Sequence, residues 1–133
     1  MADELAGLRI LVVEDNDILA TALADCLEGA GAEVLPPCPS VASALAALDR
    51  AGRIDAAVLD VRLDHETSEP IAAKAREDGI AVLLMSGFDE GALPASLQGL
   101  PLCTKPFDIK ALVGALRCLP RSHATATGNA ASS

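Results

Sequence analysis

The stretch Leu8-Arg9-Ile10-Leu11-Val12-Val13, followed at once by Glu14-Asp15-Asn16-Asp17, decides the fold. The apolar run has the length of a buried strand, and it ends abruptly in acidic side chains. Apolar residues then recur at helical spacing from Ile18 to Leu27, and Gly29 ends the pattern. A strand followed by an amphipathic helix is the unit from which parallel sheets are built.

Strand-like and helix-like segments alternate along the rest of the chain. The further apolar segments of strand length are Glu33-Val34-Leu35, Ala56-Ala57-Val58-Leu59, Ala81-Val82-Leu83-Leu84-Met85 and Leu100-Pro101-Leu102-Cys103. Helices are expected from a Ser40 cap through Leu48, from about Ser68 to Asp78 and from an Asp108 cap through Leu116, with only a short helix between Phe88 and Gly99. Apolar strands alternating with amphipathic helices predict an α/β fold: a doubly wound, five-stranded parallel sheet in the order 2-1-3-4-5, built as (βα)5.

The composition sets the broad class of protein. The chain has 133 residues, the length of one domain, and 51% of them are hydrophobic, which is enough to bury a core. Ten basic against nineteen acidic residues give a net charge of −9, which disfavours nucleic acid and anionic membrane surfaces as partners. With two Phe and neither Trp nor Tyr, stacking on nucleic-acid bases is nearly excluded.

The chain termini and the cysteines show neither a targeting signal nor a metal motif. Met1-Ala2-Asp3-Glu4 lacks the basic region of a signal peptide and no run of 18 apolar residues occurs, so a cytoplasmic protein is expected. Residues 1–119 are expected to form the domain, and residues 120–133, rich in Ala, Thr and Ser, a disordered tail. Two disulfides would be the alternative in a secreted chain, but buried free thiols are expected at Cys26, Cys38, Cys103 and Cys118.

Polar side chains stand where the expected strands end. Glu14 and Asp15 follow the first strand, Asp60 the third, Ser86 the fourth and Lys105 the fifth. The carboxyl ends of parallel strands meet at one edge of a sheet, where such sheets bind their ligands. Because the first and third strands are neighbours in the predicted order, the three carboxylates are expected to converge on one small cleft.

The chemistry of these residues favours phosphoryl transfer. Three clustered carboxylates repel one another and raise at least one pKa unless a cation joins them, and Mg²⁺ prefers oxygen ligands of this kind. Lys105 adds a positive charge, and the Ser86 hydroxyl, next to Gly87 with no side chain to block access, can donate to a phosphate oxygen. The central carboxylate, Asp60, is then the expected nucleophile.

Four segments, in order, resemble the receiver domains of two-component response regulators. They are Ile10-Leu11-Val12-Val13-Glu14-Asp15-Asn16, Val58-Leu59-Asp60-Val61, Met85-Ser86-Gly87 and Thr104-Lys105-Pro106-Phe107. The resemblance runs from Arg9 to about Leu119 and implies a flavodoxin-like fold in a bacterial phosphorelay protein. The chain is similar to the stand-alone, single-domain receivers of alphaproteobacteria.

The resemblance also implies a metal site around the acceptor. It makes Asp60 the phosphoacceptor, and it assigns the Mg²⁺ shell to Glu14, Asp15, Asp60 and the backbone carbonyl of Arg62. The segment from Arg62 to Glu66 is expected to be a loop, and it lacks the Pro-Gly pair common in the family.

Further residues of this edge receive roles from the same resemblance. Phosphate binding and switching are implied for Ser86, Gly87 and Lys105, and Lys105-Pro106 is a candidate cis peptide. Leu102 stands where most receivers carry a Tyr or Phe that moves inward on activation. We therefore expect Phe88, two residues after Ser86, to be the gating aromatic residue in its place.

The implied function is signalling through a phosphorylated aspartate. A sensor histidine kinase or a histidine phosphotransfer protein would supply the phosphoryl group, and the chain would bind an unidentified protein target or act as a phosphate shuttle or sink. No effector domain is expected after Leu119, and the partner surface is expected to include the stretch from Phe88 to Leu116. Enzymatic activity beyond self-phosphorylation from a phosphodonor and autodephosphorylation is not expected.

Other readings of the same residues remain open. A degenerate receiver would keep the fold as a phosphorylation-independent interaction module, although all the site residues are present. An aspartyl-nucleophile phosphatase usually carries a second Asp two residues after the nucleophile, where this chain has Arg62. A dinucleotide-binding domain is disfavoured because Glu14-Asp15-Asn16, and not a Gly-rich turn, follows the first strand.

Overall fold

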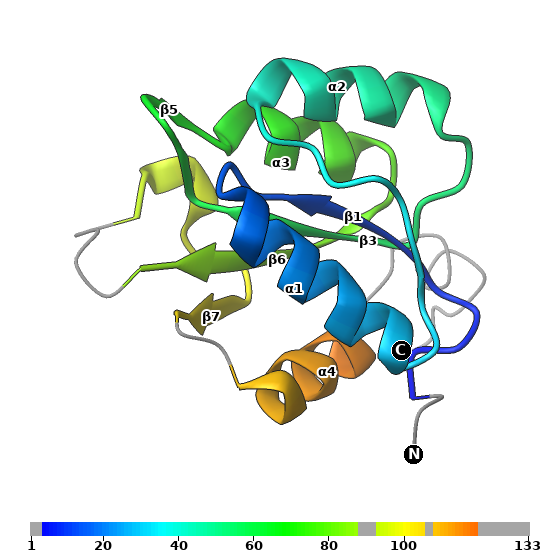
Figure 1. Cartoon of the computed structure of the whole chain (residues 1–133). Coiled ribbons are helices and arrows are strands. Elements are labelled where there is room, and N and C mark those ends of the chain that lie inside the picture. The colour runs from blue at the N-terminus through cyan, green and yellow to red at the C-terminus, as the bar shows by residue number, and fades with distance from the viewer. Residues whose placement is uncertain (1–3, 88–92, 106–107, 120–133) are drawn as a thin grey trace, which may run out of the picture.

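Five parallel strands form one sheet in the computed structural model, which describes residues 4–87, 93–105 and 108–119. The strands are β1 (Arg9–Val13), β2 (Glu33–Val34), β3 (Ala56–Asp60), β6 (Ala81–Ser86) and β7 (Leu102–Thr104), in the order β2-β1-β3-β6-β7. Figure 1 shows α2 (Val41–Arg50) and α3 (Glu69–Glu77) over one face of the sheet, and α1 (Asp17–Gly29) and α4 (Ile109–Cys118) over the other. The predicted doubly wound, flavodoxin-like sheet with its order 2-1-3-4-5 is confirmed.

Burial on both faces explains why the strands are apolar throughout. Successive side chains of a strand point to opposite faces of the sheet. Leu11 and Val13 of β1 belong to the core cluster formed with α2 and α3. Ile10 and Val12 belong to the cluster formed with α1 and α4. Every residue of β3 is buried, so the strand that carries Asp60 is held between the two clusters.

Side-chain caps fix where the helices begin. Ser40 caps α2 and Asp108 caps α4, as predicted. The Asn16 side chain caps α1 by accepting a hydrogen bond from the Leu19 amide at 3.0 Å. This cap fixes the turn from β1 into α1, and Glu14 lies in that turn.

The segment after Asp60 forms a β-hairpin, so the prediction of a loop there was wrong. β4 (Arg62–Leu63) pairs in antiparallel fashion with β5 (Glu66–Thr67). Asp64, the first of the two turn residues, has φ = 60°, in the left-handed region that two-residue hairpin turns require. Strands of two residues are too short to show a periodic pattern in the sequence.

The described part of the connection between β6 and β7 contains one short helical turn, η1 (Ala95–Leu97), in agreement with the expected short helix. Leu97 is fully buried in the core. The Ser96 hydroxyl donates to Glu69 at the start of α3, and the Thr67 hydroxyl donates to the same carboxylate at 3.0 Å. The bond from Ser96, and then that from Thr67, lower the pKa of Glu69. The bond from Ser96 joins η1 to the first turn of α3.

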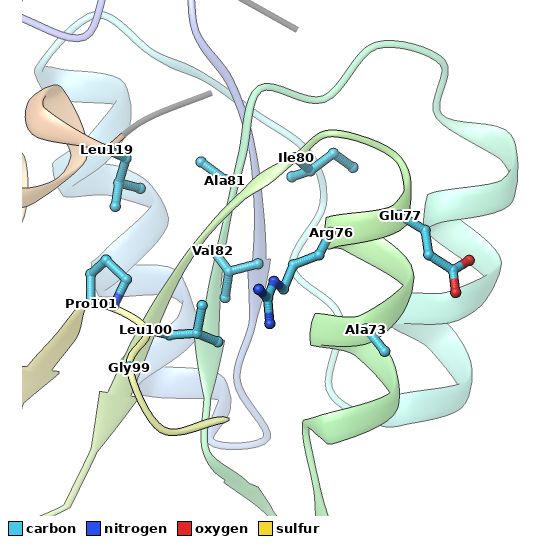
Figure 2. Close-up of a pocket in the computed structure, with 10 residues that line it drawn as sticks. All are labelled: Ala73, Arg76, Glu77, Ile80, Ala81, Val82, Gly99, Leu100, Pro101 and Leu119. Atoms are coloured by element: carbon cyan, nitrogen blue, oxygen red, sulfur yellow. The ribbon is translucent and has the colours of Figure 1, made fainter. Parts of the chain in front are cut away.

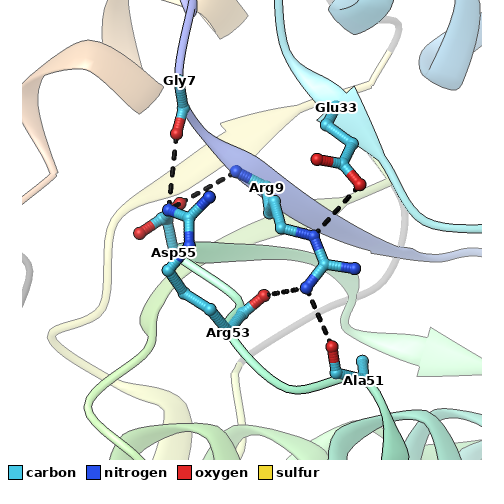
Figure 3. A network of polar contacts seen from close by, with 6 residues as sticks. All are labelled: Gly7, Arg9, Glu33, Ala51, Arg53 and Asp55. Atoms are coloured by element: carbon cyan, nitrogen blue, oxygen red, sulfur yellow. Dashed lines mark hydrogen bonds and ion pairs between the residues drawn. The ribbon is translucent and has the colours of Figure 1, made fainter.

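Arg9 ties several segments together at the start of β1 (Figure 3). Its guanidinium donates to the carbonyls of Ala51 and Arg53 at 2.8 and 2.5 Å and pairs with Glu33 at 3.2 Å. Asp55, which is only 3% exposed, accepts the Arg9 amide at 2.9 Å and pairs with Arg53 at 2.5 Å. The network fixes the start of β1 and β3. Glu14 and Asp60 lie at the opposite end of these strands.

The cysteines are free thiols, as predicted, but they differ in burial. Cys38 is buried, Cys26 and Cys103 are half-buried, and Cys118 is exposed. The prediction that all four are buried was therefore wrong. Cys118 lies two residues beyond the buried Leu116, so it faces nearly the opposite side of α4. Burial raises the pKa of the Cys38 and Cys103 thiols.

Two sequence-based expectations concern the chain beyond this core. The predicted disordered tail, residues 120–133, lies outside the described residues. Within the described residues, no helix is both long enough and apolar enough to cross a membrane.

Candidate functional site

Three carboxylates meet at the carboxyl edge of the sheet. Val13 of β1 pairs with Leu59 of β3, so Glu14 and Asp60, which follow them, come side by side. Glu14 and Asp60 are each 3% exposed, whereas the neighbouring Asp15 is exposed. One ligand oxygen from each of the three carboxylates lies within 4.8 Å of the others. The structure therefore brings together the acidic residues that the sequence placed at this edge.

Lys105 joins the cluster from β7. Pairing of Ser86 with Thr104 brings the end of β7 beside the end of β6, and the Lys105 amide donates to the Ser86 carbonyl at 2.8 Å. The Lys105 Nζ lies 2.6 Å from Asp60 Oδ1 and 3.0 Å from Glu14 Oε1. One ammonium thus bridges the two buried carboxylates.

The site holds more negative than positive charge. Burial raises the pKa of Asp60 from 3.8 to about 7, the close contact with the Lys105 ammonium opposes this rise, and the charge of Glu14 adds to it. Burial disfavours the charged form of Lys105, but its contacts with the Asp60 and Glu14 carboxylates outweigh burial and raise its pKa. A single ammonium does not neutralise three carboxylates, so the cluster is suited to a further cation.

The donor set fits a hard divalent cation. The buried Asp60 Oδ1 has no hydrogen bond of good geometry among the described residues, and its charge is met by the Lys105 ammonium alone. Carboxylate oxygens from Glu14, Asp15 and Asp60 are the ligands that Mg²⁺ takes from proteins. The residues present therefore fit the metal that the sequence predicts.

Ser86 and Gly87 lie at the end of β6, next to this cluster. Met85 pairs with Asp60, so Ser86 lies one residue beyond the carboxylate along the neighbouring strand. Ser86 and Gly87 are half-buried, and the Ser86 hydroxyl donates to the Gly87 carbonyl at 3.2 Å. Both residues are therefore placed at the predicted edge of the sheet.

The hairpin after Asp60 contributes a residue that sequence reasoning missed. The backbone amide of Asp64 donates to Asp15 Oδ2 at 2.7 Å. A two-residue turn beginning with Asp is a weak hairpin signal, and it was the only indication in the sequence. Arg62, predicted to offer its backbone carbonyl to a metal, lies in β4 with its side chain exposed.

Of the two candidate gating residues, the structure describes Leu102 but not Phe88. Leu102 is 45% exposed on β7. Phe88 and Pro106, the candidate gating aromatic residue and the candidate cis proline, lie outside the described residues. Their roles remain predictions.

A hollow of about 630 Å³ lies at the other end of β6 (Figure 2). It is lined by the start of β6, the end of α3, the segment before β7 and the residue after α4. Ile80 and Val82 line it, several positions before Ser86 at the opposite end of the strand. None of the clustered carboxylates lines this hollow, and the chemistry of the site does not involve it.

Solved structures with the same fold include a protein described as a response regulator receiver. The solution structure of SdrG from Sphingomonas melonis is 33% identical in sequence, covers 82% of this chain and 92% of that chain, and superposes with a TM-score of 0.73. A response regulator receiver protein from Sinorhizobium medicae is 26% identical, covers 84% of this chain and 91% of that one, and has a TM-score of 0.69.

A sequence relative agrees with these structures. The transcriptional regulatory protein TcrA of Mycobacterium tuberculosis is 34% identical over 125 residues, which cover 88% of this chain and 47% of TcrA. The chain thus spans about half the length of the curated relative it matches. No protein-family model matches the chain. Together with the fold, these similarities show that the chain belongs to the response regulator receiver domains.

Proposed function

We propose that this receiver domain accepts a phosphoryl group on Asp60 with Mg²⁺ as cofactor. The observation that carries the proposal is the cluster itself: Asp60 within 4.8 Å of Glu14 and Asp15, and 2.6 Å from the Lys105 ammonium. A carboxylate nucleophile surrounded by metal ligands and a fixed positive charge has what phosphoryl transfer requires, which is positioning and charge neutralisation.

The donor in this proposal is a phosphohistidine of a sensor histidine kinase or of a histidine phosphotransfer protein. An Asp60 carboxylate oxygen forms a bond to phosphorus while the bond from phosphorus to the histidine nitrogen breaks. The imidazole leaves with the bonding electron pair and takes up a proton, and an acyl phosphate remains on Asp60. In hydrolysis, the oxygen of a water molecule forms a bond to phosphorus while the bond from phosphorus to the Asp60 oxygen breaks. The Asp60 carboxylate leaves with the bonding electron pair, the water gives up a proton to solvent, and inorganic phosphate is released.

Each residue of the edge has a part in this scheme. Glu14, Asp15 and Asp60, with the carbonyl of Arg62, would hold Mg²⁺, which when bound supplies positive charge for the phosphoryl oxygens. The Lys105 ammonium already lies at Asp60 and neutralises charge on the acceptor side. The pKa of Asp60 near 7 without metal means that an added cation favours the ionised carboxylate, which is the nucleophilic form.

The phosphorylated state is proposed to be read at the same edge. Ser86 and Gly87 would contact a phosphoryl oxygen on Asp60, which is supported by the pairing of Asp60 with Met85, the residue before Ser86. The output is then phosphorylation-dependent binding of a protein partner, or passage of the phosphoryl group onward. No catalytic turnover of an external substrate is part of the proposal, which separates it from an aspartyl phosphatase.

Intact-mass measurement after incubation with Mg²⁺ and a small phosphodonor tests the proposal. The expected result is a single phosphate-sized increase that is absent in Asp60→Asn and absent without metal. Asp55→Asn is the matched control, because Asp55 is an equally buried carboxylate at the other end of β3 and its variant should still be phosphorylated. Continuous hydrolysis of an external phosphoester would indicate a phosphatase instead. No mass increase with either a phosphodonor or a candidate kinase would leave the interaction module as the function.

A further inference from the structure

We propose that the β4–β5 hairpin positions Asp15 for metal binding through the backbone N–H of Asp64. This inference rests on the proposed function, since it concerns the same Mg²⁺ site. It assigns a purpose to the segment after the acceptor, and it makes Asp64 a positioning residue that acts through Asp15.

The three carboxylates differ in how they are held. Glu14 is buried, and it accepts hydrogen bonds from the Asn16 amide at 3.0 Å and from Lys105 at 3.0 Å. Asp60 is buried and paired with Lys105 at 2.6 Å. Asp15 is exposed, and among the described residues the hydrogen bond that its carboxylate accepts comes from the Asp64 amide, at 2.7 Å. Without that bond, neither burial nor the Lys105 ammonium would orient the Asp15 carboxylate.

The hairpin is anchored to the core and to the sheet. Leu63 of β4 is 1% exposed and belongs to the core cluster beneath α2 and α3. Val61, between β3 and β4, donates its amide to the Met85 carbonyl and accepts from the Ser68 amide, both at 2.9 Å. The turn is therefore anchored to the sheet that carries Asp60, and the Asp64 amide has a fixed position relative to the acceptor.

The turn conformation directs the amide. Asp64 has φ = 60°, which a residue with a short polar side chain tolerates and which proline cannot adopt. Its own carboxylate lies 3.8 Å from the His65 ring, and both side chains are largely exposed. The contribution of Asp64 to Asp15 is therefore made by its backbone and not by its charge.

A neutral backbone amide can orient a carboxylate ligand. A cationic side chain in the same place would instead compete with the metal for the negative charge of that carboxylate. Hydrogen bonds to metal ligands fix their orientation, and losing one typically weakens metal binding by about 10- to 100-fold. Because Asp15 is the exposed ligand, we expect its support to lie at the lower end of that range.

Two variants of equal charge separate the amide from the side chain. Asp64→Gly removes the carboxylate but keeps the N–H and permits φ = 60°, whereas Asp64→Pro removes the N–H and forbids that φ. Isothermal titration with Mg²⁺ is expected to give Asp64→Pro a Kd about tenfold higher than that of Asp64→Gly. Equal Mg²⁺ affinities for the two folded variants would overturn the proposal.

A second measurement needs neither metal nor a proline variant, so it tests the contact independently of whether Asp64→Pro folds. Exchange of the Asp64 amide hydrogen, followed by NMR in metal-free protein, is expected to be slow in the wild type and about tenfold faster in Asp15→Ala, which lacks the acceptor. Equal exchange rates in the two proteins would also overturn the proposal. Neither measurement depends on phosphoryl transfer, so a chain whose Asp60 takes no phosphate could still show both effects, and the proposed function would then fail alone.

Discussion

Replacing the Asp60 carboxylate by its neutral isostere, in Asp60→Asn, should stabilise the metal-free protein. In the folded chain, burial raises the pKa of Asp60 from 3.8 to about 7, and Glu14 adds to the rise while Lys105 opposes it. A carboxyl group with a raised pKa contributes stability that is fully present below its unfolded pKa and is lost as the pH rises through the folded value. At neutral or higher pH, the ionised Asp60 carboxylate therefore destabilises the folded chain, and Asp60→Asn removes that charge.

The size of the effect follows from the pKa. A rise from 3.8 to about 7 corresponds to roughly 4 kcal/mol at about pH 8, at about 1.4 kcal/mol for each pKa unit. About 1 to 2 kcal/mol of this loss of stability is already present at about pH 5, because the Asp60 carboxyl is ionised there in the unfolded chain but still protonated in the folded chain. The stability gained by Asp60→Asn should thus grow by roughly 2 to 3 kcal/mol between about pH 5 and pH 8, and less if loss of the Lys105 ion pair offsets part of it.

Urea unfolding followed by far-ultraviolet circular dichroism measures this gain, since the chain has neither Trp nor Tyr to report by fluorescence. Both proteins are unfolded in a chelator at several pH values and again with saturating Mg²⁺. With metal, the wild type should gain more stability than the variant, because in the proposed site Asp60 would supply a ligand. An Asp60→Asn protein that is no more stable than the wild type at about pH 8 without metal would refute the reasoning.

Three further predictions concern other contacts of the fold and site. Lys105→Ala should destabilise the metal-free protein. A double-mutant cycle with Asp60→Asn, followed by urea unfolding, should give a coupling free energy of about 1 to 3 kcal/mol between the two side chains. Additive effects of the two substitutions would contradict the 2.6 Å ion pair. Asp55→Asn should lose about 1 to 3 kcal/mol of stability, because the buried Asp55 carboxylate pairs with Arg53 and accepts a backbone amide. A higher urea midpoint in this variant would show that the Asp55 charge, like that of Asp60, destabilises the folded chain. Ser40→Ala should cost about 1 kcal/mol through loss of the α2 capping box, and an unchanged thermal midpoint would contradict that role.

The sequence predicts the sheet and its acidic edge for the same physical reason. A strand buried on both faces must be apolar along its whole length, so its first polar residue marks its end. Glu14 and Asp60 are such residues, and parallel strands bring their ends to one edge, so the cluster follows from the strand order. Lys105 could be placed at this edge by the same reasoning, but its bridging of both buried carboxylates depends on side-chain geometry that a pattern does not contain.

Short segments and helix ends are where the sequence was less informative. The hairpin of Arg62–Leu63 and Glu66–Thr67 has no measurable period, and its turn lacks the Asn-Gly or Asp-Gly pair that would have indicated it. The contact from Asp64 to Asp15 joins residues far apart in the chain and is made by a backbone group, which has no side-chain signature. Cys118 stands between the buried Leu116 and Leu119 but faces nearly the opposite side of α4, and its apolar character alone did not show which side of the helix it occupies.

The most direct test of the central claim is to locate the phosphoryl group. An acyl phosphate on aspartate is converted by borohydride to homoserine, so reduction of the phosphorylated protein followed by peptide mass spectrometry identifies the modified residue. We predict a single modified residue, Asp60, that appears only after incubation with both Mg²⁺ and a phosphodonor. Modification at any other residue, or the same product at Asp60 without metal, would contradict a phosphoacceptor site built from Glu14, Asp15, Asp60 and Lys105.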